Sequence, residues 1–157
     1  MKNTTLCYIE KDGAYLMMHR IKKENDENRD KWIGIGGKLE YGESPFDCAR
    51  REILEETGLT VKKLNYKGII TFVSDLYGTE YMHLFTATGY EGTLKECDEG
   101  NLEWVSKKAV YDLPIWEGDK IFFRLIEDPN SPFFSLKLSY EGDKLVYAAL
   151  DGKEMAL

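Results

Sequence analysis

The feature that most constrains the fold is a helix whose two ends are both marked in the sequence, directly after a cluster of glycines. Three glycines lie within residues 34–37, so the backbone there turns sharply or approaches another group closely. Ser44 followed by Pro45 is typical of a helix N-terminus, because serine caps free N–H groups and proline fits the first turn. Gly58 is typical of a C-terminal cap. The sequence therefore predicts a helix over residues 45–57.

This helix would carry three glutamates on one face. Glu55 and Glu56 follow Glu52 by three and four positions, and residues at these offsets lie on the same side of a helix. By themselves, three glutamates are typical of an ordinary solvated helix face. Their carboxylates repel one another, however, and a hard divalent cation such as Mg²⁺ or Mn²⁺, which prefers oxygen ligands, would relieve the repulsion. A metal held by carboxylates beside a glycine-rich loop is typical of phosphate chemistry.

Length and charge narrow the classes of partner. The chain has 157 residues, enough for a single domain over 1–157 with one well-buried core. Its net charge of −7 argues against a protein that binds duplex nucleic acid, which needs a basic surface. The charge does not argue against a nucleotide substrate, because a bound metal can reverse the sign of the local field.

The cysteines and the apolar segments bear on location. Cys7, Cys48 and Cys97 are odd in number and widely spaced, which suggests neither a disulfide framework nor a zinc site. We therefore expect reduced thiols and a cytoplasmic protein. Cys48 lies inside the predicted helix, where core packing is expected. No segment approaches eighteen consecutive apolar residues, so neither a membrane span nor a signal peptide is expected.

The remaining patterns predict a mixed sheet between helices, an α/β (α+β) fold. Apolar and β-branched stretches predict strands over residues 4–10, 14–19, 68–73 (with a lead-in from 61), 80–88 and 102–105, and a closing hairpin of 133–140 and 144–150. Ser106 is expected to cap a short helical turn that continues through Asp112, and a second helix is expected over residues 116–127. The highly charged residues 21–31 are either a solvated connection or a lid that faces a substrate.

The arrangement around the first helix resembles the complete signature of the Nudix hydrolases. The matching residues are Gly37, Glu43, Arg51-Glu52-Ile53, Glu55-Glu56 and Gly58-Leu59. The resemblance implies an αβα sandwich around a mixed sheet, and hydrolysis of a nucleoside diphosphate linked to a further group. It also implies that the three glutamates hold Mg²⁺ or Mn²⁺, with Gly37 and Glu43 beside the metal. Arg51 is expected to orient carboxylates through its planar guanidinium group rather than contact the substrate.

The likeness extends to the MutT/MutX-type branch of this family, which acts on oxidised purine nucleoside triphosphates such as 8-oxo-dGTP. It includes residues 31–40 and 98–105, and the entry to the second helix. Carried over to this chain, the resemblance implies that Glu99 is a loop carboxylate that binds metal or water. Trp116 would stack on a purine, and Asp119 would accept N–H groups from its edge. The alternatives are a solvated loop acid for Glu99, core packing for Trp116 and a helix-dipole partner for Asp119.

This chain differs from the mammalian enzyme of this branch at Ile33. The mammalian enzyme has an asparagine at this position, and its amide forms hydrogen bonds with the base. That enzyme also has two adjacent acids where this chain has Gly118 and Asp119. We therefore expect fewer or different polar contacts to the base, and weaker selectivity for its oxidised form. Ile33, Lys38 and Lys23 complete the expected substrate-binding set.

The sequence thus predicts a Mg²⁺- or Mn²⁺-dependent nucleoside triphosphate pyrophosphohydrolase that converts 8-oxo-dGTP to 8-oxo-dGMP and pyrophosphate and so sanitises the nucleotide pool. The expected catalytic residues are Glu52, Glu55, Glu56, Arg51 and Glu99, with either Glu52 or Glu99 positioning the attacking water. One alternative substrate is ADP-ribose or a dinucleoside polyphosphate. A non-catalytic nucleotide-binding regulator is a further alternative, although such a protein should have lost these carboxylates. No membrane or duplex nucleic acid partner is expected, and the resemblance favours a monomer without fixing the oligomeric state.

Overall fold

One mixed sheet organises the chain. The computed structural model describes residues 1–157, and its nine strands follow the order β3-β2-β1-β5-β4-β7-β8-β9, with β6 beside β2. The strands are β1 (Lys2–Lys11), β2 (Ala14–His19), β3 (Trp32–Ile33), β4 (Thr60–Ser74), β5 (Gly78–Glu91), β6 (Asn101–Ser106), β7 (Phe134–Glu141), β8 (Lys144–Leu150) and β9 (Lys153–Glu154). The pairs β1–β5 and β4–β7 are parallel and the other pairs are antiparallel. The predicted mixed sheet is confirmed.

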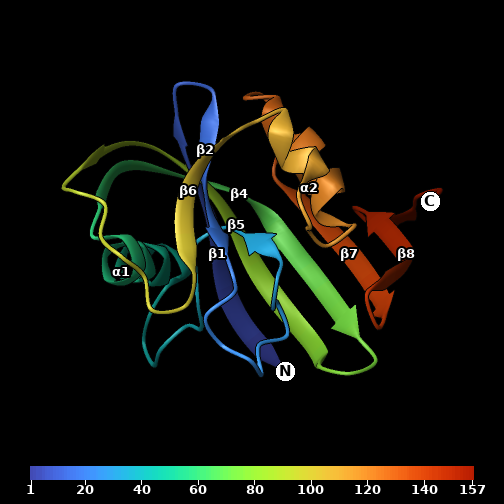
Figure 1. Cartoon of the computed structure of the whole chain (residues 1–157). Coiled ribbons are helices and arrows are strands. Elements are labelled where there is room, and N and C mark those ends of the chain that lie inside the picture. The colour runs from blue at the N-terminus through green and yellow to red at the C-terminus, as the bar shows by residue number, and fades with distance from the viewer.

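The sheet lies between the two α-helices, α1 (Pro45–Thr57) and α2 (Asp119–Glu127), which cover its opposite faces (Figure 1). Strand β1 shows how the layers form, because successive side chains of a strand point to opposite faces. Leu6 and Tyr8 belong to the apolar cluster that contains the side chains of α2. Cys7 and Ile9 belong to the cluster that contains those of α1. The chain therefore has the αβα sandwich that the resemblance implied.

Helix α1 has the bounds that the sequence predicts. The Ser44 side chain accepts a hydrogen bond from the Asp47 N–H at 3.1 Å, and the Asp47 side chain accepts one from the Ser44 N–H at 2.9 Å. This reciprocal capping box satisfies N–H groups that would otherwise lack a partner. At the other end, Gly58 adopts φ 78°, which glycine reaches without strain, and its N–H donates to the Leu54 carbonyl.

Helix α2 starts later than predicted, so the expectation of a helix from residue 116 was wrong at that end. The helix begins at Asp119. Trp116 lies before it, and its indole N–H donates to the Asn28 side chain at 2.8 Å. The Gly118 N–H donates to the Tyr140 hydroxyl at 2.7 Å. Residues 116–118 form a turn, in which the N–H groups of Asp119, Lys120 and Ile121 donate to the carbonyls of Trp116, Glu117 and Gly118. The contacts with Asn28 and Tyr140 add to these local hydrogen bonds.

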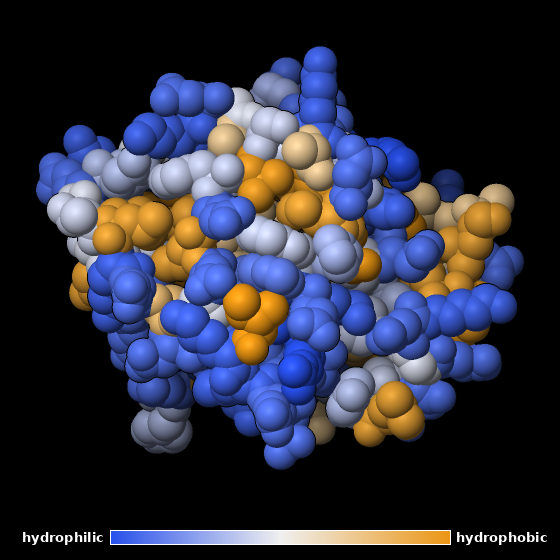
Figure 2. All heavy atoms as spheres, in the orientation of Figure 1, coloured by the Kyte–Doolittle hydropathy of each residue, from blue (hydrophilic) through white to orange (hydrophobic).

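The surface is mostly hydrophilic on the face shown in Figure 2, and apolar residues appear there in separate patches. All three cysteines are free and buried, in agreement with the absence of a disulfide framework expected from their spacing. Neither helix has the length and hydropathy that crossing a membrane would require.

Candidate active site

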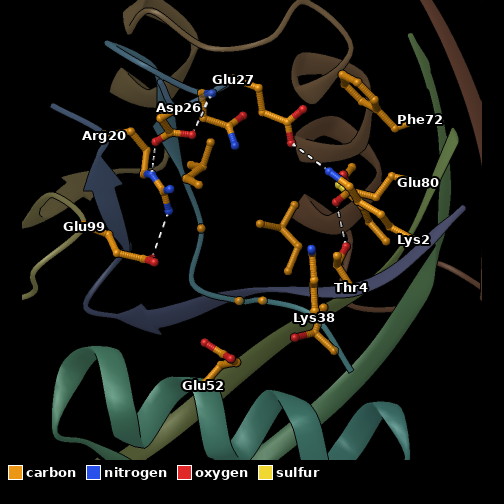
Figure 3. Close-up of a pocket in the computed structure, with 18 of the residues that line it drawn as sticks. Lys2, Thr4, Arg20, Asp26, Glu27, Lys38, Glu52, Phe72, Glu80 and Glu99 are labelled. Atoms are coloured by element: carbon orange, nitrogen blue, oxygen red, sulfur yellow. Dashed lines mark hydrogen bonds and ion pairs between the residues drawn. The ribbon is translucent and has the colours of Figure 1, made fainter. Parts of the chain in front are cut away.

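A cavity of about 480 Å³ lies where the sheet, helix α1 and two loops meet (Figure 3). Its floor is one face of the sheet, to which β1 contributes Leu6, β4 contributes Phe72 and β5 contributes Met82. Helix α1 contributes Glu52 and Glu56. The cavity therefore combines an apolar floor with a carboxylate-rich end.

Glu56 is the most constrained acid at this end. Only 9% of the residue is exposed, and its Oε2 atom is buried without a hydrogen-bond partner. Burial raises the pKa of Glu56 well above its ordinary value, and the adjacent carboxyls of Glu99 and then Glu52 raise it further. The pKa of Glu99 is lowered instead; burial opposes this, but Glu56 and then Arg20 and Lys23 favour its ionised form. The two pKa values are therefore shifted in opposite directions, so a proton is held more readily by Glu56 than by Glu99.

These residues fit a hard divalent cation. The carboxyls of Glu99 and Glu52 lie close enough to Glu56 to raise its pKa, and one Glu56 oxygen is buried without any donor, so a cation would neutralise the repulsion and satisfy that oxygen. Gly37 makes room for the Glu52 carboxylate, because a Cβ atom at Gly37 would lie 2.6 Å from the Glu52 Cδ atom. In the observed rotamers no three acidic, histidine or cysteine side chains converge as a metal site. Binding would therefore require a change of rotamer.

A change of rotamer would be needed because Arg51 already binds the oxygens of neighbouring carboxylates. It donates to Glu52 Oε1 at 2.6 Å and to Glu55 Oε2 at 3.2 Å. It also donates to both oxygens of Glu43, at 2.7 and 2.9 Å. This contact, followed by the Glu40 N–H, lowers the pKa of Glu43 to about 2. Neither Glu43 nor Glu55 lines the cavity, and the Glu55 side chain is 58% exposed.

The cavity also contains most of the predicted substrate-binding residues. Ile33, Lys38, Trp116 and Asp119 all line it. Trp116 also packs edge-on against Phe72, with ring centroids 5.1 Å apart, so core packing and cavity lining both apply to it. Only 4% of Asp119 is exposed, and burial raises its pKa well above the ordinary value, against the opposing charge of Lys31. Asp119 therefore favours its protonated form, which can donate as well as accept a hydrogen bond.

Lys23 does not line the cavity. Arg20 does line it, although the sequence patterns did not single out this residue. Arg20 donates to Glu99 Oε2 at 3.0 Å and forms an ion pair with Asp26 (Figure 3). Lys23 reaches the other oxygen of Glu99 at 3.3 Å from outside. The only signal in the sequence was the position of Arg20 at the end of a predicted strand, where side chains of a sheet edge converge.

The charged segment 21–31 is partly a wall of the cavity. Asp26, Glu27 and Asn28 line it, and the Asn28 side chain binds Trp116. Of the two readings of this segment, a cavity-facing role therefore holds for these three residues. Thr4 and Glu80, on β1 and β5, also line the cavity, and neither was singled out from the sequence.

Comparisons with known proteins agree with this architecture. A family model described as NUDIX domain matches residues 2–126. The oxidized purine nucleoside triphosphate hydrolase of Danio rerio is 37% identical over 128 residues, which cover 80% of this chain and 79% of that protein. The uncharacterized Nudix hydrolase YvcI of Bacillus subtilis (strain 168) is 32% identical over 124 residues, 76% of this chain and 75% of that protein.

A solved structure extends the similarity to nearly the whole chain. The crystal structure of the MutT protein from Bacillus halodurans has a TM-score of 0.84 at 31% identity, and the match covers 98% of this chain and 99% of that one. The similarity therefore includes the strands β7 and β8, which lie beyond the residues that the family model matches.

Proposed function

Because the chain belongs to the Nudix family and is a MutT-type Nudix hydrolase, we propose that it is a metal-dependent nucleoside triphosphate pyrophosphohydrolase. Its preferred substrates are oxidised purine nucleotides, with 8-oxo-dGTP converted to 8-oxo-dGMP and pyrophosphate. The observation that carries the proposal is the buried, unpartnered oxygen of Glu56 beside other carboxyls, in a cavity that is also lined by the aromatic side chains of Phe72 and Trp116. The named activity of the Danio rerio relative supports the choice of substrate.

The acidic end is assigned to the metal. Glu52, Glu56 and Glu99 would hold Mg²⁺ or Mn²⁺, which neutralises phosphate charge and makes bound water more acidic. Gly37 gives the Glu52 carboxylate its space. We assign Glu43 and Glu55 to the same site through Arg51, which their carboxylates bind and which in turn binds Glu52.

The residues of the chain then divide the remaining work. Arg20 and Lys38, cations in the cavity wall, would pair with phosphate oxygens and orient the polyphosphate. Glu52 or Glu99 would hold the attacking water and accept its proton while a P–O bond forms and the phosphoanhydride bond breaks. Trp116 and Ile33 would contact the faces of the base, and Asp119 its edge.

The biological setting is also a proposal. Three buried free thiols fit a reducing compartment, so we propose a cytoplasmic location. The net charge of −7 favours a free nucleotide over a duplex as the substrate.

Product analysis tests the proposed function. The protein with Mg²⁺ would be given 8-oxo-dGTP, dGTP, ADP-ribose and a dinucleoside polyphosphate at equal concentrations, with the released monophosphate and pyrophosphate both identified. We expect pyrophosphate from the triphosphates and the highest kcat/KM for 8-oxo-dGTP. A higher kcat/KM for ADP-ribose would overturn the substrate, and nucleotide binding without turnover would overturn the enzymatic assignment.

A further inference from the structure

Glu80 places an acid in the part of the cavity where apolar side chains would contact the face of a purine base. It belongs to β5, where Glu80 and Met82 lie on the same face because strand side chains alternate. The parallel pairing of β1 with β5 brings Thr4 beside them, with Thr4 opposite Met82 in register. Figure 3 shows Glu80 and Thr4 on the opposite side of the cavity from Glu99 and Arg20. Glu80 is therefore not part of the acidic end that fits a metal.

The orientation of the Glu80 carboxylate is set by one hydrogen bond. The buried Thr4 hydroxyl donates to Glu80 Oε2 at 2.7 Å. No lysine or arginine forms an ion pair with Glu80; Lys2, opposite it in register, approaches Glu27 at 4.0 Å instead. The second carboxylate oxygen is left free to accept a hydrogen bond from a molecule in the cavity.

We propose that Glu80, oriented by Thr4, is a specificity-determining residue that accepts an N–H group from the edge of a purine base. The inference rests on the proposed function, because it concerns the base of the same nucleotide. An ionised carboxylate only accepts hydrogen bonds, so it favours a base edge that carries N–H and disfavours one that carries a lone pair. Ile33 on the same cavity has no polar group, which leaves the reading of the base edge to acids such as Glu80.

The favoured substrates are therefore purine triphosphates of the guanine type. Guanine carries N–H at N1 and an exocyclic 2-amino group, whereas adenine has a lone pair at N1. Oxidation at C8 adds an N–H at N7, where ordinary guanine has a lone pair. Two substrate pairs each change one donor: 8-oxo-dGTP has the N7 hydrogen, together with the C8 oxygen, that dGTP lacks, and dGTP has the 2-amino group that dITP lacks.

The experiment measures kcat and KM for both pairs with the wild type, Glu80→Gln and Thr4→Val, all with Mg²⁺. Glutamine keeps the shape of the side chain but removes its charge and can itself donate. We expect the wild type to prefer the donor-bearing member of at least one pair by about 10–100-fold in kcat/KM, the range of a hydrogen bond to a charged group. Glu80→Gln should bring that ratio close to one, mainly through KM. The matched control is Glu91→Gln, an exposed acid near the other end of β5 that pairs with Lys62.

Thr4→Val shows whether Thr4 acts through Glu80. It should lower the same ratio in the wild-type background and have no further effect in Glu80→Gln. Selectivity ratios that Glu80→Gln leaves unchanged, or an equal loss for all three substrates, would overturn the inference. Glu80→Asp, which keeps the charge but withdraws the carboxylate, gives a second test and should also lower the ratio. If the wild type releases no pyrophosphate from any triphosphate, the proposed function fails instead, so the two failures are distinguishable.

Discussion

At the scale of single residues, the site depends on side chains that are poorly stabilised where they lie. Glu56 is buried with an unpartnered oxygen, and Asp119 is buried with a raised pKa. A fold gains nothing from such groups, because burying a carboxyl without a partner costs free energy. Groups of this kind that share a cavity mark a functional site rather than a structural one.

Replacing Glu56 with glutamine separates the effect of this carboxyl on catalysis from its effect on stability. We expect Glu56→Gln to lower kcat by at least about 100-fold, because it removes a charged metal ligand and the charge neutralisation that depends on it. The same change should not lower the melting temperature measured in EDTA, since glutamine resembles the protonated form that the buried site favours. Steady-state kinetics and thermal unfolding measure the two. Near-normal turnover at saturating Mg²⁺ would refute the role assigned to Glu56.

Gly37 is a second residue whose importance can be measured. A Cβ atom there would meet the flexible end of the Glu52 side chain at 2.6 Å, so Gly37→Ala should displace that carboxylate at little cost to folding. We expect kcat to fall by about 10–100-fold, the usual effect of misplacing a group at a reacting centre. The control is Gly13→Ala, at φ +76° with open space around it. That change should cost about 1–2 kcal/mol of stability and leave kcat unchanged. The reverse pattern would contradict the role of Gly37.

At the scale of elements, the sequence predicts best where local chemistry decides the structure. Both ends of α1 follow from caps that lie within the helix itself or next to it, and both were predicted. The start of α2 was not predicted, because residues 116–118 form hydrogen bonds with Asn28 and Tyr140, which are distant in sequence. The short strand β3 was missed for the same reason, since two residues carry no periodic pattern and form a strand only by pairing with β2.

The cap of α1 provides a test at this scale. Ser44→Ala removes the side chain that accepts from the Asp47 N–H, and we expect it to lower the free energy of unfolding by about 1 kcal/mol. Ser44→Gly is the matched control, because glycine is tolerated at this position and should cost only a few tenths of a kcal/mol. Urea denaturation of the three proteins measures the difference. Equal losses for both variants would show that the hydroxyl contributes nothing.

At the scale of the whole molecule, the cavity is assembled from segments that only the fold brings together. The cavity-lining acids of α1, Glu52 and Glu56, were predictable as neighbours, because their spacing lies within one helix. Glu80, Thr4 and Arg20 were not, because their position depends on the parallel pairing of β1 with β5 and on the path of the loop after β2. A sequence pattern shows which residues share a helix face, but not which strands become neighbours. The acidic end of the cavity was therefore easier to predict than the residues that line the rest of it.

The dependence of global stability on pH tests this assembly as a whole. Glu56 and Asp119 have pKa values raised by burial above their ordinary values of 4.5 and 3.8. The folded state therefore binds their protons more tightly than the unfolded state does, so this part of the stability is complete at low pH and is lost as pH rises above about 4. Glu43 acts in the opposite direction, because its pKa is lowered from the ordinary value of 4.5 to about 2. The stability that it contributes is complete above about pH 4.5 and is lost as the pH falls towards 2.

We therefore expect the free energy of unfolding, measured with urea in EDTA, to be highest near pH 5 and to decline through neutral pH. Asp119→Asn should flatten the decline, because asparagine has no proton to lose. Mn²⁺ or Mg²⁺ should raise stability most at neutral and alkaline pH, since a cation that binds the ionised Glu56 stabilises only the folded state. Asn130→Asp, in the exposed turn after α2, is a charge-changing control that should leave the slope unaltered. Stability that rises steadily from pH 5 to pH 8 in EDTA would contradict the burial of two unpaired carboxyls in one cavity.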